Sequence, residues 1–139
     1  EEAAPQSNFE NKTEEAAAGD AAGSSDFFVE YRLERDRTRG QRIEWLREVI
    51  NNDNSAGETR QKAQEHLLDI SSKMEKEIEL ENLLRAKGYK DAAVIADERA
   101  VTVIVTSDKL SAGETADINN LISRRTGVDA QSIVIIPKS

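Results

Sequence analysis

The sequence predicts an α+β fold: a small three-stranded mixed sheet with two helices on one face, preceded by one further helix and a disordered N-terminal tail. Two observations lead to this prediction. Three short runs rich in β-branched residues stand out in a chain that is 33% charged. The pentapeptide Ser-Ala-Gly-Glu-Thr also occurs twice, each time where a helix is expected to begin. The predicted order over residues 55–139 is therefore helix, strand, strand, helix, strand.

Residues 1–25 are acidic and rich in alanine, with Phe9 as the only large apolar residue. Such a segment cannot bury enough surface to offset the entropy of ordering, so we predict a disordered linker. Residues 26–51 carry apolar side chains at helical spacing and are predicted to form a charged helix whose Trp45 end packs on the domain. The alternative is an arm that offers three aromatic side chains to a partner: Phe27, Phe28 and Tyr31.

Both pentapeptides place a serine three residues before a glutamate, which is the capping-box pattern of a helix start. Helices are therefore predicted to begin after Ser55 and after Ser111. Each helix is predicted to end where a glycine precedes an apolar residue, at Gly88 and at Gly127.

The predicted strands are Ala92–Ala96, Ala100–Thr106 and a third run at Ile133–Ile136. A crossover through one helix would bring the third strand back parallel to the second. We expect both capped helices to cover the face of Val101, Val103 and Val105. The opposite face carries Ile104 and one pair of the third strand, either Ile133 with Ile135 or Val134 with Ile136. That apolar face needs a cover, which the Trp45 helix, another copy or a different protein could supply.

The chain offers few groups for catalysis. It has no cysteine, and its one histidine, His66, lies in a polar stretch of a predicted helix and is interpreted as solvated or half-buried. Glutamates alternate between residues 75 and 81 and are interpreted as a solvated face, because a helix spreads them around its circumference. Hydrolase, zinc and dinucleotide motifs do not occur. We predict a protein that is not an enzyme and that uses no metal or cofactor.

The net charge of −8 opposes binding to nucleic acid, which requires a surplus of lysine and arginine. An anionic membrane surface is an equally poor partner. No apolar run approaches the ~20 residues that span a bilayer. The chain begins at Glu1, so we expect a fragment whose targeting segment has been removed.

Three motifs of the chain together indicate a known family. They are the run Phe-Phe-Val-Glu-Tyr-Arg-Leu-Glu-Arg-Asp-Arg at 27–37, the helix start Ser-Ala-Gly-Glu-Thr-Arg and the strand Val-Thr-Val-Ile-Val. With them the whole chain resembles the AH family of stage III sporulation proteins of endospore-forming bacilli. The resemblance implies a mother-cell membrane protein with a single N-terminal membrane helix, absent from this chain. Its C-terminal part would lie in the space that faces the engulfed forespore. There it would bind the ectodomain of stage II sporulation protein Q and form part of a channel.

The family's helix-strand-strand-helix-strand unit is similar to the ring-building motif of type III secretion basal-body proteins, which implies a homo-oligomeric ring. The family has no catalytic motif to transfer. A KH-like nucleic-acid-binding domain has the same order of elements and is the alternative. It requires a Gly-x-x-Gly loop and a basic face, and the chain shows neither.

The partner is expected to bind along a strand edge by β-augmentation. The second strand is the favoured edge, since three side chains of the open face would flank the joint: Thr102, Ile104 and Thr106. The competing site is the aromatic group of the N-terminal helix, Phe27, Phe28 and Tyr31.

Overall fold

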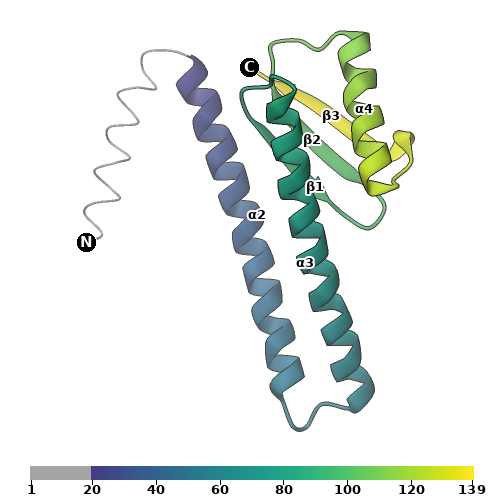
Figure 1. The fold of residues 1–139 in the computed structure, drawn as a ribbon. Coiled ribbons are helices and arrows are strands. Elements are labelled where there is room, and N and C mark those ends of the chain that lie inside the picture. The colour runs from purple at the N-terminus through teal and green to yellow at the C-terminus, as the bar shows by residue number, and fades with distance from the viewer. Residues whose placement is uncertain (1–19) are drawn as a thin grey trace, which may run out of the picture.

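The computed structural model describes residues 20–139, with side chains from residue 26 onward. The elements are α2 (Asp20–Asn51), α3 (Gly57–Ala86), β1 (Ala92–Ala96), β2 (Val101–Thr106), α4 (Ala112–Thr126), the 3-10 turn η1 (Ala130–Ser132) and β3 (Ile133–Lys138) (Figure 1). The predicted α+β class and its order of elements are confirmed. Most of the predicted disordered linker, residues 1–19, lies outside the described residues, while α2 begins at Asp20, ahead of the predicted boundary at residue 26.

The sheet has the strand order β1-β2-β3, with β1 antiparallel and β3 parallel to β2. At the middle of the sheet, Val103 lies opposite both Val94 and Ile135. The prediction that β2 offers a free edge is therefore wrong. The crossover through α4 returns β3 to the one side of β2 that the β1–β2 hairpin leaves unpaired.

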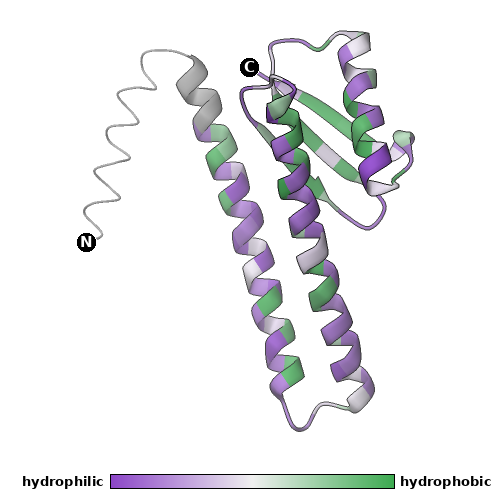
Figure 2. Ribbon diagram, viewed as in Figure 1, coloured by the Kyte–Doolittle hydropathy of each residue, from purple (hydrophilic) through white to green (hydrophobic). Residues whose placement is uncertain are grey.

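One face of the sheet packs against α3 and α4, as predicted. Leu80 and Leu84 of α3 and Ile118 and Ile122 of α4 are fully buried together with the three valines of β2. In Figure 2 the strands are largely green, and the ribbons of α3 and α4 beside them carry green segments among the purple ones. This cluster is the main core of the molecule.

The opposite face is covered in part by α2. Phe28 is 0% exposed and packs against Ala93 of β1 and Ile104 of β2. Phe27 lies edge-on to Phe28, with 5.4 Å between the ring centroids. The helix therefore does cover the sheet, but through its Phe28 end. The Trp45 end packs on α3 instead of on the sheet: Leu46 is buried against Ala63 and Ile70, while the Trp45 side chain itself is 62% exposed.

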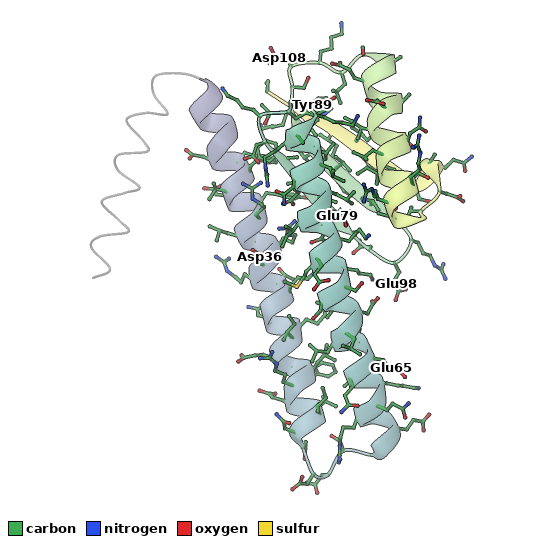
Figure 3. The ribbon with its side chains drawn as sticks, in the orientation of Figure 1. Asp36, Glu65, Glu79, Tyr89, Glu98 and Asp108 are labelled. Atoms are coloured by element: carbon green, nitrogen blue, oxygen red, sulfur yellow. The ribbon has the colours of Figure 1, made fainter. Side chains whose placement is uncertain are left out.

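α2 and α3 form a long antiparallel hairpin whose connected ends extend beyond the sheet (Figure 1). Leu46, Ala63 and Ile70 are buried there and hold the two helices together. Glu65 marks this distal half of α3 in Figure 3. Within residues 20–139, no helix combines the length and the apolar character needed to cross a membrane.

The two identical pentapeptides differ in what they do. Ser111 caps α4 as predicted: its Oγ accepts from the Glu114 N–H at 3.0 Å, and the Glu114 carboxylate accepts from the Ser111 N–H at 2.9 Å. α3 begins after Ala56 without a side-chain cap. The predicted capping box at Ser55 is wrong, because the Ser55 N–H donates to the carbonyl of Asn52 instead.

Both predicted C-terminal glycines adopt positive φ. Gly127 caps α4 at φ 77°, and Gly88 follows the end of α3 at φ 116°. Side chains with a Cβ rarely adopt these angles, so glycine is required to turn the chain out of each helix.

Candidate protein-docking surface

The outer edge of β1 has its backbone donors occupied by side chains of α3. The Val94 N–H donates to Oε2 of Glu81 at 2.9 Å, and the Ala96 N–H donates to Oε2 of Glu77 at 2.7 Å. Glu77 and Glu81 are four residues apart and so lie on one face of α3, which aligns them with alternate residues of the strand.

The acceptors of the same edge are occupied by side chains of α2. Nη1 of Arg35 donates to the Val94 carbonyl at 2.7 Å, and Nη1 of Arg32 donates to the Ala92 carbonyl at 2.9 Å. Side chains of α2 and α3 thus take the place of a fourth strand along this edge. A foreign strand finds the backbone groups of Ala92 and Val94 and the N–H of Ala96 already bonded.

The same side chains pair with one another. Arg39 donates two hydrogen bonds to Glu77, at 2.8 and 2.7 Å, and Arg35 donates to Glu81 at 2.7 Å. Burial opposes the charge of Arg35, but the hydrogen bond and the charge of Glu81 outweigh it and raise its pKa. The hydrogen bond to Glu77 likewise raises the pKa of Arg39. Both guanidinium groups therefore stay charged.

Asp91 extends this charged cluster to the start of β1. It accepts from Nη1 and Nη2 of Arg32 at 3.1 and 3.2 Å and from Arg85 at 3.0 Å. Burial alone would raise the pKa of Asp91. The hydrogen bonds from Arg32 and from the Ala92 N–H, with the charges of Arg32 and Arg85, outweigh that effect and lower the pKa.

The glutamates that alternate along α3 are not a solvated face, so that interpretation is wrong for two of them. Glu77 is 1% exposed and Glu81 is 3% exposed. α2 passes over this side of α3 and brings arginines to them, which sequence spacing along α3 alone does not show. The His66 side chain is exposed, which is the solvated one of its two predicted environments.

The opposite edge of the sheet is β3. The Ser107 N–H donates to the Lys138 carbonyl at 3.0 Å, so the backbone groups of Lys138 point toward β2. Successive residues of a strand point their backbone groups to opposite sides, so Val134 and Ile136 also face β2. The backbone groups of Ile133, Ile135 and Pro137 face outward.

Few donors remain on this outward side. The Ile133 N–H donates to the carbonyl of Ala130 in η1, and proline has no N–H. Among the described residues, the edge therefore presents one free N–H, that of Ile135, beside the carbonyls of Ile133, Ile135 and Pro137. We call these groups the β3 edge.

Apolar side chains flank the β3 edge on the α2 face of the sheet. Val134 is 51% exposed and Ile136 is 42% exposed, and they lie opposite Thr102 and Ile104 in the register. Of the two pairs considered for this face, Val134 with Ile136 is the one that points away from α3 and α4. α2 covers Ala93 and Ile104 but leaves this pair open. Lys138, at the end of the strand, lies over the Phe27 ring at 5.0 Å.

The structure joins the two competing docking sites into one packed cluster. Phe28 and Ile104 are buried against each other, with Phe27 and Tyr31 around them. The remaining candidates are half-buried: Thr102 and Thr106. The exposed residues beside the free edge are instead Val134 and Ile136. The signal in the sequence was the alternation within the third strand, which could not by itself tell which pair is exposed.

No group of three or more acidic or histidine side chains within the described residues could hold a metal ion. The ionisable side chains buried between α2, α3 and β1 bind one another and the backbone. The surface suited to a macromolecule is at the opposite edge of the sheet, where the β3 edge lies beside its apolar flank.

Comparison with solved structures shows a similar fold. The chain aligns over 81% of its length with 98% of a chain in the structure of the SpoIIQ-SpoIIIAH pore forming complex, with a TM-score of 0.69 and 26% identity. The type III secretion system protein EscJ of enteropathogenic E. coli gives a TM-score of 0.48 and 22% identity over 53% of this chain and 51% of that one.

Sequence comparison points the same way. The chain is 28% identical over 99 residues to Stage III sporulation protein AH of Bacillus subtilis (strain 168). The match includes 71% of this chain and 45% of the relative, so the chain spans less than half of that protein's length. The model of the SpoIIIAH-like protein family matches residues 1–135. The chain therefore belongs to the SpoIIIAH-like protein family.

Proposed function

We propose that the chain is a non-enzymatic interaction module of a sporulation protein and that its partner is the ectodomain of the forespore membrane protein SpoIIQ. The observation that carries this proposal is the alignment with 98% of a chain in the SpoIIQ-SpoIIIAH complex. The module would lie in the space between mother cell and forespore during engulfment, where the ectodomains of two membranes can meet.

The complex that contains the similar chain is described as pore forming. This supports assembly of several copies, each with its partner, into a ring around a channel. A ring requires one surface for the partner and further surfaces between neighbouring copies. The β3 edge is available for the first of these roles.

The packing of the chain agrees with a scaffold. Arg35, Arg39, Glu77 and Glu81 are held by one another and by the backbone of β1. Their hydrogen bonds fix α2 and α3 against the sheet, and so give the module a rigid edge strand on one side.

The test is binding between the purified chain and the SpoIIQ ectodomain of the same organism, measured by calorimetry and by co-elution in size-exclusion chromatography. We expect a stable complex with a dissociation constant on the order of 1 μM or tighter. The KH-like alternative is tested in parallel by titrating single-stranded RNA at increasing salt. Salt-sensitive RNA binding without binding of the ectodomain would overturn the proposal.

An unrelated acidic protein of similar size is the control for nonspecific association. Labelled fusions in sporulating cells test the location. The fusion should gather at the engulfing membrane only when SpoIIQ is present, and uniform distribution in both cases would contradict the proposed placement.

A further inference from the structure

We infer that two copies of this chain pair through α2, antiparallel and side by side, about a two-fold axis between Gln41 and Arg42. The pairing surface consists of residues that recur at alternating spacings of three and four along one side of α2. They are Leu33, Asp36, Gly40, Ile43, Arg47 and Ile50. We call these residues the α2 stripe. The pairing goes beyond the proposed function and does not depend on it.

The α2 stripe is turned away from the sheet and is largely open to solvent. An α-helix turns about 100° per residue, so Leu33 lies about 140° around α2 from Phe28, which packs on β1 and β2. Leu33 is 55% exposed, and the side chain of Asp36, which is labelled midway along α2 in Figure 3, is 58% exposed. A Cβ added at Gly40 would meet nothing within 4 Å, and Arg47 is exposed as well.

The spacing of the α2 stripe is that of a coiled-coil seam. Alternating steps of three and four keep one side of a helix against a second helix. Ile43 and Ile50 are half-buried beside Leu46 in the contact with α3, which holds this part of the stripe in place. Glycine weakens the interior of a helix, and Gly40 has neither a positive φ nor a close neighbour that requires it. In a pair of copies it would allow the facing helix to approach closely.

The charges of the stripe match when the two helices run in opposite directions. The facing pairs would be Asp36 with Arg47, Leu33 with Ile50, and Gly40 with Ile43. Two-fold symmetry makes each pair occur twice, so the contact extends over about 26 Å of helix. Each layer then combines opposite charges, two apolar side chains, or a glycine with an isoleucine. Beside the seam, the same register brings Arg37 near Glu44 of the other copy, again with opposite signs.

Other arrangements of two α2 helices match less well. In a parallel pair each residue meets its own equivalent, so Asp36 would face Asp36 and Arg47 would face Arg47. An antiparallel pair shifted by seven residues places Arg47 against Val29 in one direction and against Ile43 in the other. Both shifts leave Asp36 without an opposite charge. The sequence of the stripe therefore favours the one register described above.

A second copy is the occupant that this charge pattern fits. A two-fold contact closes on itself and joins two copies only, so a ring needs other surfaces in addition. The stripe is one helix wide and has few large apolar side chains. We therefore expect a weak pair, with a dissociation constant on the order of 10–100 μM.

The first experiment reverses the two charges separately and then mixes the variants. Sedimentation equilibrium of the unaltered chain between about 1 μM and 1 mM should show monomers and dimers in exchange. Asp36→Lys and Arg47→Glu should each raise the dissociation constant at least about tenfold, because like charges would then face each other twice. An equimolar mixture of the two variants should regain the dimer. In that mixed pair the new lysine faces the new glutamate, and the remaining Asp36 and Arg47 face each other.

The second experiment compares two apolar positions of the same helix. Leu33→Lys should weaken the pair at least about tenfold, because the lysine would lie against Ile50 of the other copy. Trp45→Lys is the matched control. Trp45 is 62% exposed but lies about 200° around α2 from Ile43, so this variant should pair as the unaltered chain does. Circular dichroism and thermal melting of each variant would verify that the fold is retained.

The outcomes decide the inference without reference to the SpoIIQ ectodomain. A monomer at every concentration would overturn it, and so would unchanged pairing of both charge variants. If the mixture of the charge variants stays monomeric, Asp36 and Arg47 do not face each other and the register is wrong. If Trp45→Lys abolishes pairing while Leu33→Lys does not, the copies meet on another side of α2. Binding of the ectodomain tests the proposed function separately.

Discussion

The two edges of this sheet are treated in opposite ways. At β1, side chains from two helices bind the backbone groups of Ala92, Val94 and Ala96. At β3, one N–H and three carbonyls face outward with no partner among the described residues. An exposed edge promotes uncontrolled pairing, and proteins usually block it. With one edge closed and the other open, β3 is the one edge of the described sheet to which a further strand could pair.

The closed edge depends on carboxylates that serve two purposes. One oxygen of Glu81 accepts both the Val94 N–H and Nη1 of Arg35. Glu77 does the same for Ala96 and Arg39. Burying a charge is costly, and it is tolerated where each oxygen has a donor and each charge has a partner. The open edge contains no charge and depends on solvent for its hydrogen bonds.

The largest effect is expected from opening the closed edge at Glu77. Glu77→Ala leaves the Arg39 guanidinium without its partner and the Ala96 N–H without an acceptor, both inside the molecule. Breaking a buried pair in this way costs about 3–5 kcal/mol of unfolding free energy. Urea denaturation monitored by circular dichroism measures the loss.

Glu79→Ala is the matched control, because Glu79 lies two positions further along the same helix and pairs with Arg125 at a partly exposed site. Its cost should stay below about 1 kcal/mol. Equal, small losses in both variants would show that the closed edge does not depend on Glu77.

A smaller effect is expected at the start of β1, and it depends on pH. The folded state lowers the pKa of Asp91, so its ionised form stabilises the protein above the pKa of the unfolded chain. That contribution is lost as the pH falls through the folded pKa. Asp91→Asn should therefore cost about 1 kcal/mol at neutral pH and very little in strong acid.

Urea titrations of the Asp91→Asn variant and the unaltered chain at several pH values test this. The two stability curves should converge as the pH falls below the ordinary range of a carboxyl group. A constant gap across the whole range would mean that Asp91 acts through its shape and not through its charge.

Much of the fold could be predicted from the sequence, since the signals for it are local. Alternating valines of β2 identified the face that α3 and α4 cover, and Ser111 and Gly127 marked the two ends of α4. The closed edge was missed because it is not local. Glu77 and Glu81 lie four residues apart, and Arg35 and Arg39 do as well, yet each pair alone resembles an exposed helix face. Only the docking of α2 beside α3 brings them together.

Strand addition itself stays a prediction, but the strand to which the sequence assigned it has no free edge. Strand addition was expected at β2, which is the central strand of the sheet. The crossover sets the order of the strands, so the residues of β2 alone could not show that both of its sides are paired. Ile104 was taken as exposed because the sequence could not show that Phe28 covers it. Val134 and Ile136 were one of two possible pairs, and the choice between them depends on the register with β2.

The smallest effect on stability, but a distinct one on association, is expected at Pro137. The backbone nitrogen of Pro137 faces outward, so Pro137→Thr breaks no bond of the ladder and should change the free energy of unfolding by no more than about 0.5 kcal/mol. The substitution gives the β3 edge a second N–H. Two copies could then form up to four backbone bonds, and sedimentation velocity should show stronger self-association than that of the unaltered chain. Adding Val134→Lys to the same chain should restore the sedimentation of the unaltered chain, because each lysine would lie against the apolar Ile136 of the other copy. If Pro137→Thr sediments as the unaltered chain does at every concentration, the shortage of donors is not what keeps the open edge from pairing with itself.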